Sequence, residues 1–279
     1  MTVAILGAGW IGQPLGRVLA EAGHTVHAAT TTPEKLAAIR KAGLRPFLVA
    51  ASPDGIEGSE VARFFEADAL VITLPPGRGT PGVEERYGGT MERIYGAATA
   101  IPHAVFTSST SVYPDLGGAP VVTEAEAGHA RDERLRASAR AIVAEEAWLP
   151  DTFRTASILR LAGLYGPGRS PTRYLAGRSD LSGGNRPVNL VHRDDVVAAI
   201  QRVLDDRIAG TFNLAADEHP TRRDYHTAAA RALGLVPPVF APDSSPVVGK
   251  RVSNARAKDV LGATFRPLDP ARHAEDTAA

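Results

Sequence analysis

The sequence predicts a Rossmann-type, doubly wound α/β sheet with a small, discontinuous C-terminal substrate lobe. Short, continuous apolar runs alternate with segments of helical period, and a glycine-rich loop directly follows the first apolar run. Continuous apolar strands between helices are typical of a parallel sheet covered on both faces. The length also fits a core and a lobe, since a domain takes about 150 residues. We expect a nucleotide-binding core over residues 1–165 and a smaller lobe over residues 166–279, interleaved with the last core strands and helices.

The first 110 residues carry the clearest alternation. We expect buried strands at Val3–Leu6, Thr25–Ala29, Pro46–Val49, Ala69–Leu74 and Ala104–Thr107. The intervening periods predict helices that run from the glycine loop to about Gly23, then over Pro33–Lys41, Ser59–Glu66 and Glu84–Ala100. Pro33 supports the second of these helices, because proline is favoured in a first turn.

The alternation continues more loosely toward the C-terminus. The pattern predicts helices at Asp132–Leu149, Asp195–Leu204, Thr221–Leu233 and Ser253–Leu261, and strands at Thr155–Leu161, Val188–Val191 and Thr211–Ala215. Arg169–Pro187 has no clear period and is expected to be a loop or small lobe. We further expect Asp195 to cap a helix, His192 to bond locally at a strand end, and Trp148 to lie in the core.

Charge and composition exclude several classes of function. Thirty-one Lys plus Arg balance thirty-one Asp plus Glu, which leaves no basic excess for nucleic acid. No apolar run approaches the ~20 residues of a membrane span, and the first residues enter a strand with no room for a secretory leader. The chain has no cysteine, and its eight histidines lack metal-ligand spacing. We therefore expect a cytoplasmic protein with a small-molecule substrate and no metal, nucleic acid or membrane partner.

The loop Gly7-Ala8-Gly9-Trp10-Ile11-Gly12 is the strongest single motif. Gly7 permits a tight turn, Gly9 lets the backbone approach a pyrophosphate, and Gly12 lets helix and strand pack closely. Trp10 and Ile11 complete the loop, with Trp10 expected to pack or to line the cofactor channel. The loop predicts a dinucleotide site, because a strand precedes it and a helix follows.

The end of the second strand bears on which dinucleotide binds. An NAD site usually places an Asp or Glu there to hold the ribose hydroxyls. This chain has Thr30 and Thr31 instead, with Lys35 and Arg40 as the nearest cations. Without a carboxylate a 2′-phosphate is not repelled, and the threonine hydroxyls can donate to it. The sequence therefore favours NADP(H) over NAD(H).

Several segments together resemble the extended short-chain dehydrogenase/reductase superfamily, the NAD(P)-dependent epimerase/dehydratase family. Besides the glycine loop, they are Val105–Tyr113, Leu159–Gly168, Val191–Val196 and Gly210–Leu214. Within that family the chain is most similar to the atypical YeeZ-like members, through Leu74-Pro75-Pro76, the Gly-Arg-Ser at residues 168–170 and Lys250–Asn254.

The resemblance implies roles for particular residues. Ser109 would face the nicotinamide at a strand end and hydrogen-bond the substrate oxygen. The cofactor would be lined by Leu74, Pro75, Pro76, Thr107 and Ser108, with Ala162 and Gly163 near its nicotinamide end. The variable substrate loop would contribute Arg169, Arg173 and Arg186, whose forked guanidinium groups suit a carboxylate or phosphate. A homodimer that pairs through the long helices is also consistent with the family.

One departure from the family is serious. Its chemistry normally uses a Tyr-x-x-x-Lys pair, in which the Tyr transfers the proton and the Lys lowers its pKa. Alignment of the long helix puts Ser138 at the Tyr position and Ile142 at the Lys position. Three interpretations remain open: a substitute acid such as Tyr113, Ser138 or His103; cofactor-assisted chemistry that needs less proton transfer, such as epimerisation, dehydration or imine reduction; or a non-catalytic dinucleotide sensor.

Overall fold

A computed structural model describes residues 1–77, 79, 81–242, 246–270 and 272. The chain divides into two compact units. The core unit comprises Met1–Val112, Gly128–Leu159 and Val197–Thr211. The second unit comprises Tyr113–Ala127, Arg160–Val196 and the chain from Phe212 onward. The chain thus passes between the units several times, and a single boundary at residue 165 stays a prediction.

The described residues contain an eight-stranded sheet in the order β12-β9-β6-β5-β1-β2-β3-β4. β1 (Thr2–Leu6) pairs in parallel with both β2 (Thr25–Thr30) and β5 (Ala69–Ile72). The parallel pairs continue outward to β3 (Arg45–Ser52) on one side and β6 (His103–Ser109) on the other. The remaining strands are β4 (Gly55–Gly58), antiparallel to β3, β9 (Thr155–Leu161) and β12 (Gly210–Leu214). This confirms the doubly wound α/β fold, with its topological switch point between β1 and β5.

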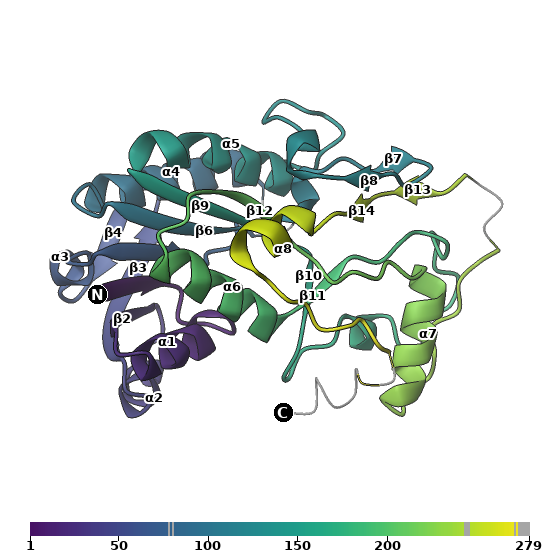
Figure 1. Ribbon diagram of the computed structural model, residues 1–279, viewed down its shortest axis with the longest axis horizontal. Helices are drawn as coiled ribbons and strands as arrows, with labels where there is room; N and C mark the ends of the chain where they lie inside the picture. The colour runs from purple at the N-terminus through teal and green to yellow at the C-terminus, as the bar shows by residue number, and fades with distance from the viewer. Residues whose placement is uncertain (78, 80, 243–245, 271, 273–279) are drawn as a thin grey trace. The chain divides into compact units, whose positions relative to one another are not determined.

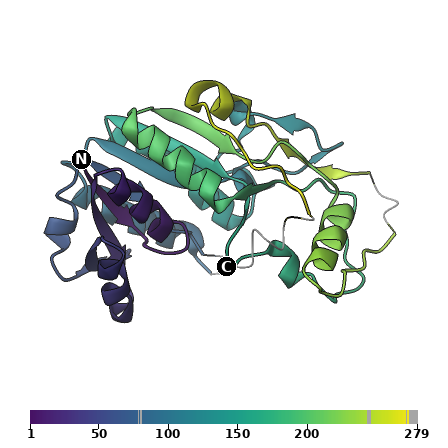
Figure 2. The same cartoon turned by 60° about the horizontal axis from the view of Figure 1, so that its bottom comes forward.

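Helices cover both faces of the sheet (Figures 1 and 2). α1 (Gly12–Glu21) and α6 (Arg193–Asp205) lie on one face, where His24 contacts Asp205 at 3.2 Å. α4 (Val83–Ala97) and α5 (Ala137–Thr152) pack together on the other face. Two shorter helices, α2 (Leu36–Lys41) and α3 (Val61–Phe64), contact β3 near the edge. β5 is wholly apolar and buried, and β1 is so from Val3 to Leu6, because helices cover both sides.

The second unit is built from short paired segments (Figure 1). β10 (Gly163–Tyr165) pairs with β11 (Leu190–His192), β7 (Leu116–Gly117) with β13 (Val248–Gly249), and β8 (Val121–Val122) with β14 (Arg251–Val252). Its helices are α7 (Arg222–Ala232) and α8 (Ala255–Leu261). A buried apolar cluster joins β10, β11 and α7 with neighbouring loops: Tyr165, Val188, Leu190, Ala216, Tyr225, Ala229 and Leu268.

Most expected elements are present, and the differences have local causes. β4, β7, β8, β10, β13 and β14 were not expected, because strands of two to four residues show no periodicity. α5 begins at Ala137 instead of Asp132, since Arg136 is still extended at φ −69° and ψ 152°. Trp148 is 65% exposed, so its expected place in the core is wrong. The described part of the chain contains no helix whose length and apolar character would let it cross a bilayer.

Candidate functional site

The glycine loop closes the C-terminal end of β1 and opens α1. A Cβ on Gly7 would lie 2.5 Å from Thr73 Oγ1, and Gly7 has a φ of +110° that disfavours any side chain. A Cβ on Gly12 would lie 2.2 Å from the Gly7 carbonyl oxygen. Gly9 differs, because it is exposed and a Cβ there would meet nothing within 4 Å. The loop therefore presents open backbone at one glycine and is tightly packed at the other two.

The switch point of the sheet brings a second strand end to this loop. Thr73, just after β5, donates from its hydroxyl to the Gly7 carbonyl at 2.8 Å. The next residues, Leu74, Pro75 and Pro76, are half-buried or exposed, and the Tyr87 hydroxyl of α4 fixes the Leu74 carbonyl at 2.9 Å. The residues expected to line a cofactor thus follow β5 at the position where α/β sheets bind ligands.

The end of β2 carries hydroxyls in place of a carboxylate. Thr30 is buried, and its oxygen accepts the Thr32 N–H at 3.2 Å. Thr31 and Lys35 are exposed. The Ala8 N–H donates to the Ala29 carbonyl at 2.7 Å, which holds this strand end against the glycine loop.

The end of β6 presents three consecutive hydroxyl side chains. Thr107 donates to the Ile72 carbonyl at 3.1 Å, and the buried Ser108 donates to the Glu146 carboxylate of α5. Ser109 is half-buried, and its oxygen accepts the Ser111 N–H at 3.1 Å. That bond occupies a lone pair of Ser109, so its hydroxyl hydrogen can donate to a substrate oxygen.

Helix α5 carries no phenol or ammonium where the family pair would lie. Ser138 is half-buried in its first turn, and Ile142, one turn later, is buried and apolar. The Arg140 guanidinium is held by Glu84 of α4 at 2.8 and 2.9 Å. Below them lies the buried Glu145, whose pKa burial raises to about 7. Ser138 and Ile142 thus lie one turn apart on α5, and their match to the positions of the family's Tyr and Lys stays a prediction.

The other two candidate acids are Tyr113 and His103. Tyr113 belongs to the second unit and is 1% exposed. Its hydroxyl donates to Asn213 Oδ1 at 2.6 Å and accepts from Arg160 Nη1 at 2.9 Å. His103 begins β6 at the end opposite Ser109, about 20 Å away along the strand. Burial lowers the pKa of His103 to about 4, so it is neutral near pH 7.

The remaining predicted site residues lie in the second unit. Ala162 is buried and its N–H donates to the Leu214 carbonyl at 3.0 Å. Gly163 is exposed, and a Cβ on it would come within 2.6 Å of Leu190 Cδ2. Arg169 and Arg173 are exposed, whereas the half-exposed Arg186 pairs with Asp115.

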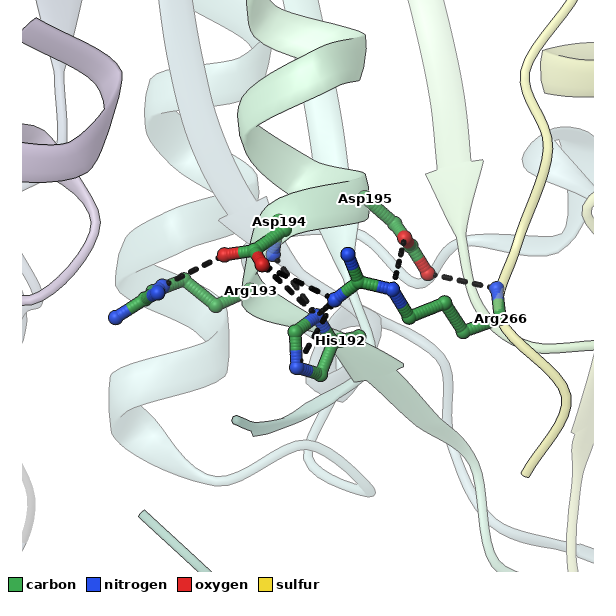
Figure 3. A network of polar contacts seen from close by, with 5 residues as sticks. All are labelled: His192, Arg193, Asp194, Asp195 and Arg266. Carbon is green, nitrogen blue, oxygen red and sulfur yellow. Dashed lines mark hydrogen bonds and ion pairs between the residues drawn. The ribbon is translucent and has the colours of Figure 1, made fainter. Parts of the chain in front are cut away.

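The start of α6 forms a polar network with Arg266 (Figure 3). The expected cap at Asp195 is wrong, because α6 begins at Arg193 and both Asp194 and Asp195 lie in its first turn. His192 takes the capping position instead, and its Nδ1 accepts the Asp194 N–H at 3.2 Å. Arg266 lies 3.1 Å from an Asp194 oxygen, and its N–H donates to Asp195 Oδ2 at 2.9 Å. His192 therefore bonds locally, as expected, and its ring also contacts the Arg266 guanidinium, 74 residues further along the chain.

Sequence reasoning missed the side chains that tie the second unit together. Arg160 is buried and donates to the Glu124 carbonyl at 2.8 Å as well as to Tyr113. Lys250 donates to the Tyr113 carbonyl at 2.5 Å and lies 3.2 Å from Asp115. The only signal was the Lys250–Asn254 string itself, since nothing local links residue 250 to residue 113. No group of three or more His, Asp or Glu side chains suited to a metal occurs in the described ranges.

Sequence comparison finds one family model and a full-length relative. The model for ketopantoate reductase PanE/ApbA matches residues 3–52, the segment around the glycine loop. Protein YeeZ of Escherichia coli strain K12 is 37% identical over 273 residues, which cover 96% of this chain and 97% of that protein.

Solved structures share the fold at lower identity. A UDP-glucose-4-epimerase from Stenotrophomonas maltophila, with bound NAD and formylated UDP-arabinopyranose, is 18% identical with a TM-score of 0.78. The match covers 99% of this chain and 96% of that one. A short-chain dehydrogenase/reductase superfamily protein from Agrobacterium tumefaciens with bound NAD is 20% identical with a TM-score of 0.74, over 100% and 96% of the two chains. At these identities the likeness shows the fold.

Proposed function

Because the chain belongs to the atypical, YeeZ-like group of the extended short-chain dehydrogenases/reductases, we propose that it is an NAD(P)(H)-dependent oxidoreductase or epimerase. Its substrate is a small carbonyl, alcohol or imine. The observation that carries the proposal is the contrast within the glycine loop, where Gly7 and Gly12 are tightly packed and Gly9 is open. Only the middle glycine then offers backbone that a pyrophosphate can approach.

The residues of the core unit fit a nicotinamide dinucleotide. Gly9 and the start of α1, whose first turn carries no acid to repel an anion, would hold the pyrophosphate. Two structures with the same fold hold NAD, which supports this class of cofactor. We propose NADP(H) as the preferred form, because Thr30 and the exposed Thr31 replace the usual carboxylate. The bound dinucleotide supplies or accepts the hydride.

The chain's own side chains polarise the substrate more than they transfer protons. Ser109 donates its hydroxyl hydrogen to the substrate oxygen, and Ser138 is the candidate for a proton relay from α5. Tyr113 cannot take that role without breaking its bonds to Asn213 and Arg160. A substrate that needs little help with its proton, such as an iminium, is therefore favoured. Arg169, Arg173 and Arg186 are proposed to contact the substrate from the variable loop.

Thermal unfolding with NADPH, NADP, NADH or NAD in separate samples tests the cofactor claim. A ligand at a hundred times its Kd stabilises the native state by ~2.7 kcal/mol, which raises Tm by several degrees in a protein of this size. We expect the larger shift with the phosphorylated pair. No shift with any dinucleotide would contradict the proposal.

Turnover separates the enzyme from a sensor. We expect cofactor oxidation or reduction with at least one member of a carbonyl, imine and alcohol panel. Ser109→Ala is expected to lower kcat by about 10²-fold, as loss of an oxyanion donor does, with the dinucleotide shift unchanged. Tight dinucleotide binding without any turnover would instead favour a sensor, in keeping with the absent tyrosine and lysine.

A further inference from the structure

The Asp115 carboxylate, in the second unit, pairs with two positively charged side chains. Its Oδ2 pairs with Arg186 and its Oδ1 lies 3.2 Å from Lys250 Nζ. Burial would raise the pKa of Asp115, but Lys250 and Arg186 outweigh it and lower that pKa. Arg222 is a third cation, and it is close enough to Arg186 to feel its charge. Burial, and then the charge of Arg186, lower the pKa of Arg222. Within the part of the chain that the structure describes, the single Asp115 carboxylate thus bridges the Arg186 and Lys250 side chains.

Lys250 is held in place independently of Asp115. The chain has four lysines, and the other three, Lys35, Lys41 and Lys258, are exposed, whereas the Lys250 side chain is 14% exposed. Its ammonium donates to the Tyr113 carbonyl at 2.5 Å. Its own carbonyl accepts from Asn189 Nδ2 at 3.0 Å, and β13 and β14 flank it on either side. Such a fixed ammonium suits a binding site, because little conformational entropy remains to be lost.

Arg186 is also positioned by its surroundings. Its backbone carbonyl accepts the Arg222 N–H at 2.8 Å. Gly183, at φ +68°, leaves room for the Arg186 stem, since a Cβ there would come within 2.6 Å of Arg186 Cδ. The Arg186 side chain is 38% exposed, so its guanidinium can also meet a ligand.

We propose that Lys250 and Arg186 bind the carboxylate of a small acidic substrate, and that Asp115 is an internal competitor which occupies the pair in the absence of that substrate. Asp115 gives one oxygen to each cation, which is the arrangement an incoming carboxylate would reproduce. Its side chain is 41% exposed and can turn away. The assignment rests on the proposed function for its substrate site, and it gives the Lys250–Asn254 string a role.

The direction in which Asp115→Asn changes the Kd for a carboxylate tests the proposal. With only four lysines, labelled lysine amines give four NMR signals, and loss of one in Lys250→Met assigns Lys250. The probes are acetate, malonate and inorganic phosphate, each against chloride at equal ionic strength. We expect a carboxylate to shift the Lys250 signal saturably, and Asp115→Asn to tighten its Kd at least tenfold. Lys250→Met should abolish binding, measured by calorimetry, whereas Lys258→Met, which removes an exposed lysine, should not.

Several results would overturn the proposal. Unchanged or weaker carboxylate binding in Asp115→Asn would mean that Asp115 only stabilises the fold. Tighter binding of phosphate than of both carboxylates would refute the ligand class, and an equal loss in Lys258→Met would refute the site. NADPH stabilisation of the same variants separates this inference from the proposed function: a normal NADPH shift without carboxylate binding overturns only the inference, whereas carboxylate binding without any dinucleotide shift overturns only the cofactor claim.

Discussion

The glycine loop and the network around Tyr113 reach a fixed geometry in opposite ways. The loop uses six consecutive residues, and its shape depends on backbone and on the absence of side chains at Gly7 and Gly12. The Tyr113 network uses Arg160 and Asn213, which lie 47 and 100 residues further along the chain and meet only through side-chain hydrogen bonds. The glycine loop is therefore specified locally, and the Tyr113 network is specified by long-range contacts.

The largest expected effect tests the local half of this comparison. Gly12→Ala places a Cβ 2.2 Å from a backbone oxygen that cannot yield easily. We expect it to lower the free energy of unfolding by about 3 kcal/mol, as overpacking against backbone does, and to remove NADPH binding. Gly9→Ala has open space, so its stability should stay within about 0.5 kcal/mol of the parent while the NADPH shift is lost. Urea unfolding measures the stability of the two variants, and thermal shift measures their NADPH binding. Equal stability of Gly12→Ala and Gly9→Ala would contradict the prediction that Gly12 is tightly packed and Gly9 is open.

The next effect tests the long-range half. Tyr113→Phe leaves Asn213 Oδ1 and Arg160 Nη1 without their phenol partner in a buried site. We expect a loss of about 1–3 kcal/mol of stability, the cost of unsatisfied buried groups, with kcat changed less than tenfold. Tyr174→Phe is the matched control, since Tyr174 is 77% exposed. A drop in kcat of a hundredfold with unchanged stability would restore Tyr113 as the substitute acid.

Glu145 adds a third case to this comparison, because its side chain makes a hydrogen bond to another side chain within the core unit. It accepts from the Tyr95 hydroxyl at 2.9 Å, and burial raises its folded pKa to about 7, above the unfolded value. The protonated form is therefore favoured by folding, and its contribution to stability is lost as pH rises through about 7. Between pH 5 and pH 8 the parent should lose about 2 kcal/mol more stability than Glu145→Gln, since each pKa unit is worth ~1.4 kcal/mol. Equal losses in urea unfolding at the two pH values would refute the shifted pKa.

The smallest effect is expected at Trp148. Its side chain on α5 is 65% exposed, so Trp148→Ala should change the free energy of unfolding by less than about 0.5 kcal/mol. Ile158→Val, at a buried position of β9, should cost about 0.5–1.5 kcal/mol. Urea unfolding of the two variants provides the measurement, and a comparable loss in both would mean that Trp148 is covered in the native protein.

The sequence by itself determined the core fold and the glycine loop. The apolar run of β1, the glycine spacing that follows it and the amphipathic α1 are local signals, because strand, turn and helix propensities act over a few neighbouring residues. The alignment that puts Ser138 and Ile142 at the positions of the family's Tyr and Lys is also local, because both residues lie on one helix, and it stays a prediction.

Only the tertiary structure decided which distant side chains meet. Asp115, Arg186 and Lys250 come together because β13 and β14 pair with β7 and β8, strands of two residues that carry no periodic signal. The capping role of His192 and the exposure of Trp148 depended likewise on where a helix begins and which face it buries. Propensity and pattern fix short-range structure, whereas contacts across more than a hundred residues depend on how the whole chain packs.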